Sequence, residues 1–193
     1  SARETSAPDI LLISGDDLGA YLGCYGDPYA RTPHMDKVAS EGVRFENAWV
    51  AQASCSPSRS AILTGLYPHQ NGQIGLAHLG FNMSREFDSI PTLLNAAGYF
   101  TGQVGKFHIK PQTSFPFTHL WDVGGAKNRD PKVIGQAVGE FLDKAGDKPF
   151  FLHASLHDPH RPFIENVNGS PADPLTSADV ALLPFMRGLE DVP

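Results

Sequence analysis

The chain has 193 residues, and 15 Lys and Arg against 21 Asp and Glu leave a formal net charge of −6. This acidic balance argues against a nucleic-acid-binding protein, which normally carries a basic excess or a basic stripe. A hydrophobic content of 41% with 19% charged residues predicts a folded globular chain. The longest aliphatic run, residues 10–13, is far shorter than the roughly 20 residues of a membrane helix. We therefore expect no nucleic-acid partner and no membrane span.

Cys24 and Cys55 allow one disulfide but neither a disulfide scaffold nor a cysteine metal cage. The first residues lack the basic, apolar and small-residue pattern of a signal peptide, so we expect none in this chain.

The first elements expected in chain order are a strand, a helix and a second strand. Residues 9–14, which contain the unbroken apolar run 10–13, are typical of a strand buried on both faces of a parallel sheet. A helix then begins with Thr32 as its N-cap and Pro33 at its first position, and it ends at Gly42. Residues 44–50 are predicted to form the next strand.

The alternation of strands and helices continues along the chain. The expected elements are a helix with Ser56 as N-cap, a helix at about residues 89–97, a strand at 101–107, a helix capped by Asp130 and ended by Gly146, and a strand at 150–157. This order predicts an α/β core over residues 1–160 with a largely parallel sheet flanked by helices. Ligands should lie beyond the carboxyl ends of its strands. Residues 161–193 are predicted to be a proline-rich irregular segment.

Asp16 and Asp17 directly follow the first predicted strand. Two adjacent carboxylates repel each other unless a cation or a proton lies between them, and their oxygens suit Ca²⁺ or Mg²⁺. The pair is therefore a candidate cation site. The structural alternative is a turn capped by Asp17 beside a solvated Asp16.

The stretch from Cys55 to Arg59 is the most informative in the chain. With Ser56 as N-cap, Cys55 would lie at a helix N-terminus, where free N–H groups and the helix dipole favour an anion. Arg59 is four residues further on and shares a helical face with Cys55. These residues fit an acidic thiol nucleophile, or a buried free cysteine beside a surface arginine.

Lys106 and His108 share parity, so in an extended segment both side chains point to the same side. A lone pair of this kind is otherwise an ordinary exposed feature. In the strand at 150–157, His153 and His157 lie on one face about 13 Å apart at ~3.3 Å per residue, too far to share a metal ion. His157, at the carboxyl end, is the better catalytic candidate. We expect His153 to be packed or hydrogen-bonded and His160 to shape the loop.

The segment Cys55-Ser56-Pro57-Ser58-Arg59, followed by Leu63-Thr64-Gly65, resembles the sulfatase signature, in which the cysteine is converted to formylglycine. Further segments in sulfatase order are Gly15-Asp16-Asp17, Thr32-Pro33-His34-Met35-Asp36, His69-Gln70-Asn71-Gly72, Gly105-Lys106-x-His108 and His157-Asp158-Pro159-His160-Arg161. Two of these, at His69 and His157, look most like the heparan N-sulfatases (sulfamidases). The resemblance covers nearly the whole chain and implies the N-terminal part of an alkaline-phosphatase-like fold.

The resemblance implies that Asp16, Asp17 and the formylglycine at position 55 bind Ca²⁺, with Mg²⁺ as the alternative ion. Arg59 would then hold the formylglycine oxygens and Lys106 would bind the sulfate. His108 would contact the formylglycine hydrate, and His157 the leaving nitrogen or oxygen. Sulfatases complete the cation site with a later Asp-Asn pair, and no Asp-Asn dipeptide occurs in these 193 residues.

The leading hypothesis is a hydrolase that removes sulfate from a glycan, with N-sulfoglucosamine as the favoured substrate. The alternatives are a phosphoester hydrolase of the same superfamily and an inactive fragment that binds sulfated glycans. The resemblance implies a formylglycine-generating maturation enzyme as partner and allows a homodimer. It also implies a periplasmic or secreted protein in bacteria, or a lysosomal one in animals.

Overall fold

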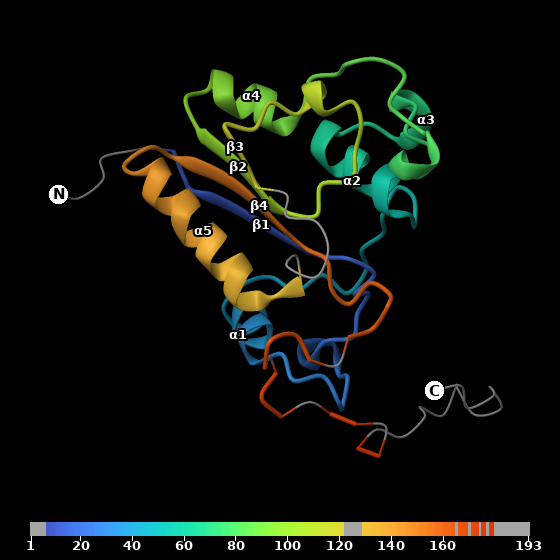
Figure 1. Cartoon of the computed structure of the whole chain (residues 1–193), viewed down its shortest axis with the longest axis vertical. Helices are drawn as coiled ribbons and strands as arrows, with labels where there is room; N and C mark the ends of the chain where they lie inside the picture. Colours follow the sequence, from blue (N-terminus) through green and yellow to red (C-terminus); the bar gives the residue numbers. More distant parts are fainter. Residues whose placement is uncertain are drawn as a thin grey trace. The chain divides into compact units, whose positions relative to one another are not determined.

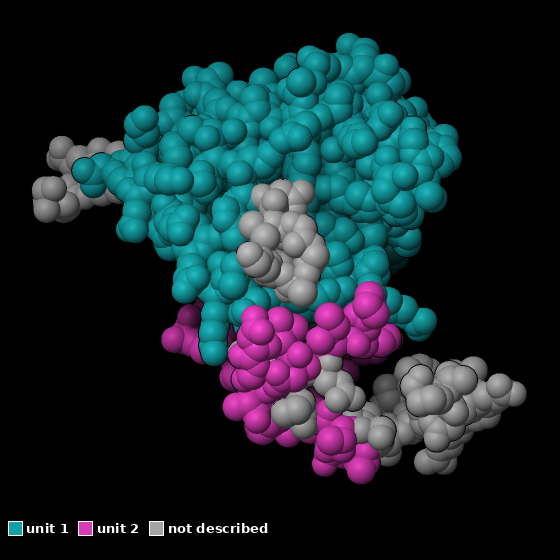
Figure 2. Space-filling view, in the orientation of Figure 1, with its two compact units in different colours: residues 1–18, 45–161 teal, residues 19–44, 162–193 magenta. Residues whose placement is uncertain are grey.

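The computed structural model describes residues 7–121, 129–164, 166–169, 171–173, 175–176 and 178–179. It forms two compact units, one of residues 1–18 and 45–161, the other of residues 19–44 and 162–193 (Figure 2). The first unit contains the sheet and every residue predicted for the site. The last proline-rich residues, 180–193, lie outside the described part, and the extent of the domain stays a prediction.

The sheet of the first unit has four parallel strands (Figure 1). Their order in space is β1 (Ile10–Gly15), β4 (Phe150–Leu156), β2 (Phe100–Gly105) and β3 (His119–Trp121). Gly15 lies opposite Leu156, and Gly105 lies opposite Ser155, so three strands end at nearly the same level. The predicted parallel sheet is therefore confirmed, and its carboxyl edge brings three chain segments together.

Helices cover the sheet on both faces (Figure 1). Helix α5 (Pro131–Ala145) packs Phe141 against a core that includes Val104 and Leu152. On the other face, α2 (Cys55–Thr64) contributes Leu63 to a core that includes Phe151. Helix α4 (Ile90–Ala96) packs against this second core. Successive side chains of β4 point to opposite faces of the sheet, so Phe151 and Leu152 belong to two separate hydrophobic layers.

Most predicted helix ends are confirmed. Helix α1 (Pro33–Glu41) has Thr32 as its N-cap, and the Asp130 carboxylate accepts a hydrogen bond from the Lys132 N–H at the start of α5. Helix α2 begins one residue earlier than predicted, with Ser54 as N-cap, so the assignment of Ser56 as the cap is wrong. The short helices, which were not predicted, are η1 (Gly23–Tyr25), α3 (Pro68–Asn71), η2 (Ala77–Leu79) and η3 (Gln112–Ser114). No helix among the described residues is long and apolar enough to cross a membrane.

Two expectations about strands are wrong. Residues 44–50 form no strand, because no strand of the described sheet pairs with them; the side chain of Trp49 is 85% exposed. Strand β1 is not buried on both faces either. It lies at the edge of the described sheet, where Leu11 and Ile13 remain exposed although they share a face with the residues that α5 covers. Apolar sequence alone does not decide burial, which requires neighbouring elements.

Candidate active site

The candidate site lies at the carboxyl edge of the sheet, where three neighbouring strands end. Asp16 follows β1, Lys106 follows β2 and His157 follows β4. The strands β2 and β4 end slightly before the predicted positions, so Lys106 and His157 belong to the loops just beyond them. This is the place where parallel sheets bind ligands.

Asp16 is 5% exposed and is bound by two cationic side chains. Its Oδ1 lies 3.2 Å from Nη2 of Arg59, and its Oδ2 accepts a hydrogen bond from Nζ of Lys106. Burial alone would raise the pKa of Asp16, but the Lys106 hydrogen bond and the charges of Arg59 and Lys106 outweigh it and lower the pKa. The carboxylate is therefore held in its charged form.

Arg59 joins α2 to the ends of β2 and β4. Its Nη1 donates to the carbonyl oxygen of Lys106 at 2.9 Å and to the hydroxyl of Ser155. Arg59 is only 6% exposed, so the alternative that placed a surface arginine beside Cys55 is wrong. Arg59 thus fixes the positions of the loop after β2 and of the Asp16 carboxylate.

Cys55 is the first residue of α2, and its Sγ lies 3.7 Å from Nζ of Lys106. Of the two alternatives for Cys55, the acidic thiol is wrong for the unmodified cysteine. Burial and the negative charge of Asp16 raise the pKa of Cys55, and the positive charge of Lys106 only partly opposes them. Both Cys55 and Cys24 are free, so the disulfide that the composition allowed is not formed.

Backbone conformation places Lys106 and His108. Gly105 has φ = 91°, and a Cβ atom there would lie 2.2 Å from the carbonyl oxygen of Ser155, so only glycine fits. The turn lets the Lys106 N–H donate to that same oxygen at 2.9 Å. His108 has φ = 55°, so the segment is not extended, and the parity of the two positions does not fix the relative direction of their side chains.

Asp17 and His160 lie beside this centre. Asp17 has φ = 63°, its side chain is 62% exposed, and its Oδ2 is 3.9 Å from Nε2 of His160. One potential ligand atom each from Asp16, Cys55 and His160 lie within 4.8 Å of one another. His160, which was expected only to shape the loop, therefore lies closer to the candidate cation site than the sequence indicated.

The turn that follows β4 is held by a residue that the sequence did not reveal. Arg129 is buried, donates to the Asp158 carboxylate and donates to the carbonyl oxygen of His160 at 2.8 Å. The rings of His157 and His160 lie 5.2 Å apart. Burial first, and then the charges of Lys106 and Arg129, lower the pKa of His157. Sequence reasoning could not find Arg129, because its partners are about 30 positions away.

His153 behaves as a packed and hydrogen-bonded residue. It is 2% exposed, and its Nε2 lies 2.9 Å from the hydroxyl oxygen of Ser14. Burial, followed by the charge of Arg59, lowers its pKa to about 3. His153 is thus a neutral histidine beneath the site.

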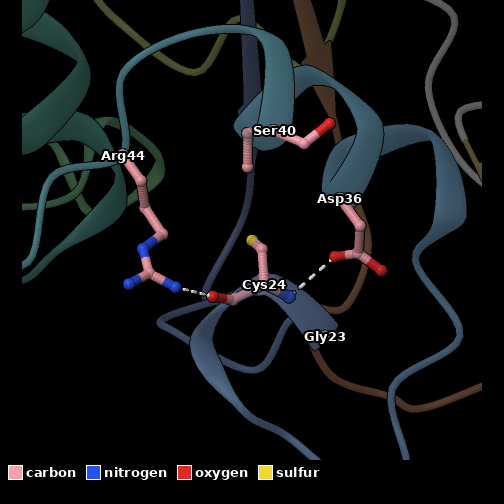
Figure 3. Close-up of a pocket in the computed structure, with 6 residues that line it drawn as sticks. Gly23, Cys24, Asp36, Ser40 and Arg44 are labelled. Atoms are coloured by element: carbon pink, nitrogen blue, oxygen red, sulfur yellow. Dashed lines mark hydrogen bonds between the residues drawn. The ribbon is translucent and has the colours of Figure 1, made fainter.

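The second unit has a separate hollow of about 460 Å³ beside Cys24 (Figure 3). The Asp36 carboxylate there accepts hydrogen bonds from the Cys24 N–H at 2.7 Å and from the Thr32 hydroxyl at 3.0 Å. Arg44 donates to the carbonyl oxygen of Cys24. These polar groups bind the turn of η1 to α1, and none of the predicted site residues lines this hollow.

The donor chemistry of the first unit is compatible with a hard divalent cation. Asp16 and Asp17 supply adjacent carboxylates, the ligand type that Ca²⁺ and Mg²⁺ prefer. One of them is buried and already paired with cations, so a bound ion would compete with Lys106 for Asp16. Ca²⁺ takes six to eight oxygens, so further donors are needed beyond this pair.

Comparison with known proteins identifies relatives over most of the chain. The sulfatase family model matches residues 8–176. The chain is 40% identical over 158 residues to N-sulphoglucosamine sulphohydrolase of Homo sapiens, covering 78% of this chain and 31% of that protein. It is also 40% identical over 183 residues to N-acetylglucosamine-6-O-sulfatase of Bacteroides thetaiotaomicron, covering 82% and 32%.

A solved structure gives the same result for the fold. A protein in complex with its substrate D-glucosamine-2-N,6-O-disulfate matches with a TM-score of 0.70 and 28% identity, over 83% of this chain and 36% of that one. The predicted alkaline-phosphatase-like fold is therefore confirmed. The chain spans about a third of the length of these relatives. By its sequence and its fold, the chain belongs to the sulfatase family.

Proposed function

We propose that the protein is a sulfatase that hydrolyses a sulfate ester or sulfamate on a saccharide, with N-sulfoglucosamine as the favoured substrate. The observation that carries this proposal is the pair of buried cationic groups, Arg59 and Lys106, beside Cys55 and Asp16. Such a cluster suits a small oxyanion, because charge-assisted hydrogen bonds are strong where water is excluded.

The raised pKa of the Cys55 thiol supports a nucleophile other than a thiolate. In the proposed enzyme, residue 55 is formylglycine, whose hydrate supplies one hydroxyl to attack sulfur and a second whose deprotonation expels sulfate. Arg59 would orient these oxygens, and Lys106 would bind the sulfate. Asp16 and Asp17 would hold Ca²⁺ or Mg²⁺, which polarises the sulfate oxygens when bound.

Two histidines are proposed to move protons. His157 would protonate the leaving nitrogen or oxygen, because an amine or alkoxide cannot depart unprotonated. Burial and the charges of Lys106 and Arg129 lower its pKa, and a bound anionic sulfate would favour the imidazolium form. Burial, together with the charges of Lys106, His78 and Arg59, lowers the pKa of His108 to about 4. A neutral His108 can accept the proton released at residue 55.

The substrate class rests on the relatives. Two of them are named for glucosamine sulfates, one N-linked and one 6-O-linked, and each is 40% identical to this chain. Sequence identity therefore does not distinguish an N-sulfate from a 6-O-sulfate as the substrate. The net charge of −6 opposes long-range attraction of a polyanion, so recognition must depend on local cationic groups and on a pocket for one terminal sugar.

The test is sulfate release by the natural-length protein, produced together with a formylglycine-generating enzyme. Glucosamine N-sulfate, glucosamine 6-sulfate and a phosphate monoester are compared, with Cys55→Ala as the inactive control. We expect the N-sulfate to have the highest kcat/KM. Faster turnover of the 6-sulfate would mean that the enzyme prefers the sulfate ester to the sulfamate. A preference for the phosphate monoester would overturn the proposal. Sulfate binding without turnover would support a binding protein.

Partners and location follow from the same proposal. The proposed partner is a maturation enzyme that converts Cys55 to formylglycine, and a homodimer is the oligomeric state to test by light scattering. A periplasmic or secreted location in bacteria, or a lysosomal one in animals, matches an enzyme of extracellular glycans.

A further inference from the structure

His78 contacts the proposed catalytic His108, although the two residues are 30 positions apart. Nδ1 of His78 lies 2.8 Å from Nε2 of His108. Their rings stack with centroids 5.0 Å apart and an interplanar angle of 16°. His78 is exposed, whereas His108 is partly buried. The pair therefore joins a solvent-facing imidazole to one beside the site.

The position of His78 is fixed by a second contact. His78 lies in η2, and the N–H of the preceding Ala77 donates to Oγ of Ser56 at 3.0 Å. Ser56 is fully buried and directly follows Cys55 in α2. The short helix is thus anchored at the same helix end that carries the proposed nucleophile.

His108 itself has a conformation that needs support. Its φ of 55° lies in the left-handed region, which is costly for a residue other than glycine and persists only where the surroundings impose it. Its Nδ1 is buried and has no hydrogen-bond partner within the described part of the chain. His78 binds the other nitrogen, so Nδ1 is the ring nitrogen of His108 that has no partner among the described residues.

A neutral imidazole has one N–H and one lone pair, and the hydrogen bond at one nitrogen decides the state of the other. If His108 donates its Nε2–H to Nδ1 of His78, Nδ1 of His108 carries the lone pair and can act as a base. The reverse bond would make Nδ1 of His108 a donor. Burial, followed by the charges of Lys106, His78 and Arg59, disfavours a second proton on His108.

We infer that His78 is a positioning residue, which accepts the Nε2–H of His108 and thereby keeps Nδ1 of His108 free to accept a proton. This inference rests on the proposed function, in which that proton comes from the second hydroxyl at residue 55. The O–H electron pair then forms the aldehyde carbonyl, and sulfate leaves with the electrons of its carbon–oxygen bond. The resulting imidazolium remains hydrogen-bonded to His78.

Three variants of the natural-length protein test the inference. His78→Phe keeps a stacked ring but removes the acceptor, and we expect kcat to fall ~10- to 100-fold with little change in KM. His78→Asn places an acceptor oxygen near the lost nitrogen and should recover most of that activity. His69→Phe is the matched control, because His69, in α3, is also an exposed histidine whose ring stacks on a neighbouring ring, that of Tyr67. This variant should leave kcat unchanged.

A second measurement does not depend on turnover. Long-range ¹H–¹⁵N spectra of the histidine-labelled protein, assigned with His108→Gln, report which nitrogen of His108 is protonated. We expect the Nε2–H form in the wild type and a mixture of both tautomers in His78→Phe. An Nδ1–H form in the wild type, or unchanged kcat and tautomer in His78→Phe, would overturn the inference. If the wild-type protein lacked sulfate hydrolysis, the proposed function would fail while the spectra still tested the histidine pair.

Discussion

Asp16 and Asp36 illustrate how differently two regions of the chain use an aspartate from a sulfatase-like segment. Asp16, in the first unit, is buried and bound by the side chains of Arg59 and Lys106. Asp36, in the second unit, is bound by the Cys24 N–H and the Thr32 hydroxyl. The first arrangement concentrates charge at the end of a sheet, and the second holds a turn. An aspartate of a family motif is therefore a stronger candidate for a role in the reaction when its partners are charged side chains.

The ion pairs extend this comparison and give the largest expected effect. Arg59→Met should destabilise the protein by roughly 3 kcal/mol, because it leaves the buried Asp16 with one cation instead of two. The matched control is Arg31→Met, which removes an exposed pair with Asp173 and should cost less than ~1 kcal/mol. Urea unfolding measures both. Equal losses in the two variants would mean that burial does not distinguish the regions.

His157 tests whether the turn after β4 takes part in catalysis. His157→Ala should lower kcat on a sulfamate by ~10²-fold or more, while turnover of an activated aryl sulfate falls much less, because nitrophenolate departs unprotonated. The natural-length enzyme is used, with exposed His34→Ala as the control. Equal losses on both substrates would assign His157 to sulfate binding or to structural support.

His153 should make the stability of the protein depend on pH. Its pKa is lowered from 6.5 to about 3 in the folded protein, so the unfolded chain binds the proton more tightly between these values. Its contribution to stability is complete above pH 6.5 and falls as the pH decreases toward 3. This single group should cost about 2 kcal/mol between pH 7 and pH 5.

The measurement is the free energy of unfolding in urea at both pH values. His153→Gln retains a polar group for Ser14 but cannot titrate, so its loss between pH 7 and pH 5 should be smaller than that of the wild type by this amount. Parallel pH dependence in the two proteins would contradict a buried neutral His153.

Asp36 should give the smallest effect. Asp36→Ala removes two hydrogen bonds that hold η1 to α1, which should lower stability by about 1 to 2 kcal/mol. Sulfate hydrolysis by the folded fraction should be unchanged. Exposed Asp143→Ala on α5 serves as the control. A specific loss of kcat in Asp36→Ala would show that the second unit contributes to the chemistry.

The sequence predicted the helix starts and strand ends that are determined by neighbouring residues. The cap at Asp130, the N-terminal Pro33 and the polar ends of β1, β2 and β4 all follow from nearby residues. Burial of β1 and pairing of residues 44–50 depend on distant elements, and both predictions were wrong.

The same limit applies to the site. The sequence placed Cys55 and Arg59 on one helical face, but it could not place His78 against His108 or Arg129 against the turn at Asp158, because folding brings these residues together. From the helix end alone, the sequence also allowed an acidic thiol at Cys55 as one of two alternatives. The opposite shift arises from burial and from Asp16, a residue 39 positions away.

The central claim is that residue 55 acts as formylglycine in this cationic cluster and not as a thiol. Peptide mass spectrometry of the natural-length protein, purified from a host with the maturation enzyme, tests it directly when specific activity is measured on the same sample. We predict a loss of about 18 Da at position 55, in a fraction of molecules that rises in proportion to sulfate release. High specific activity in protein that carries only unmodified Cys55 would contradict the account.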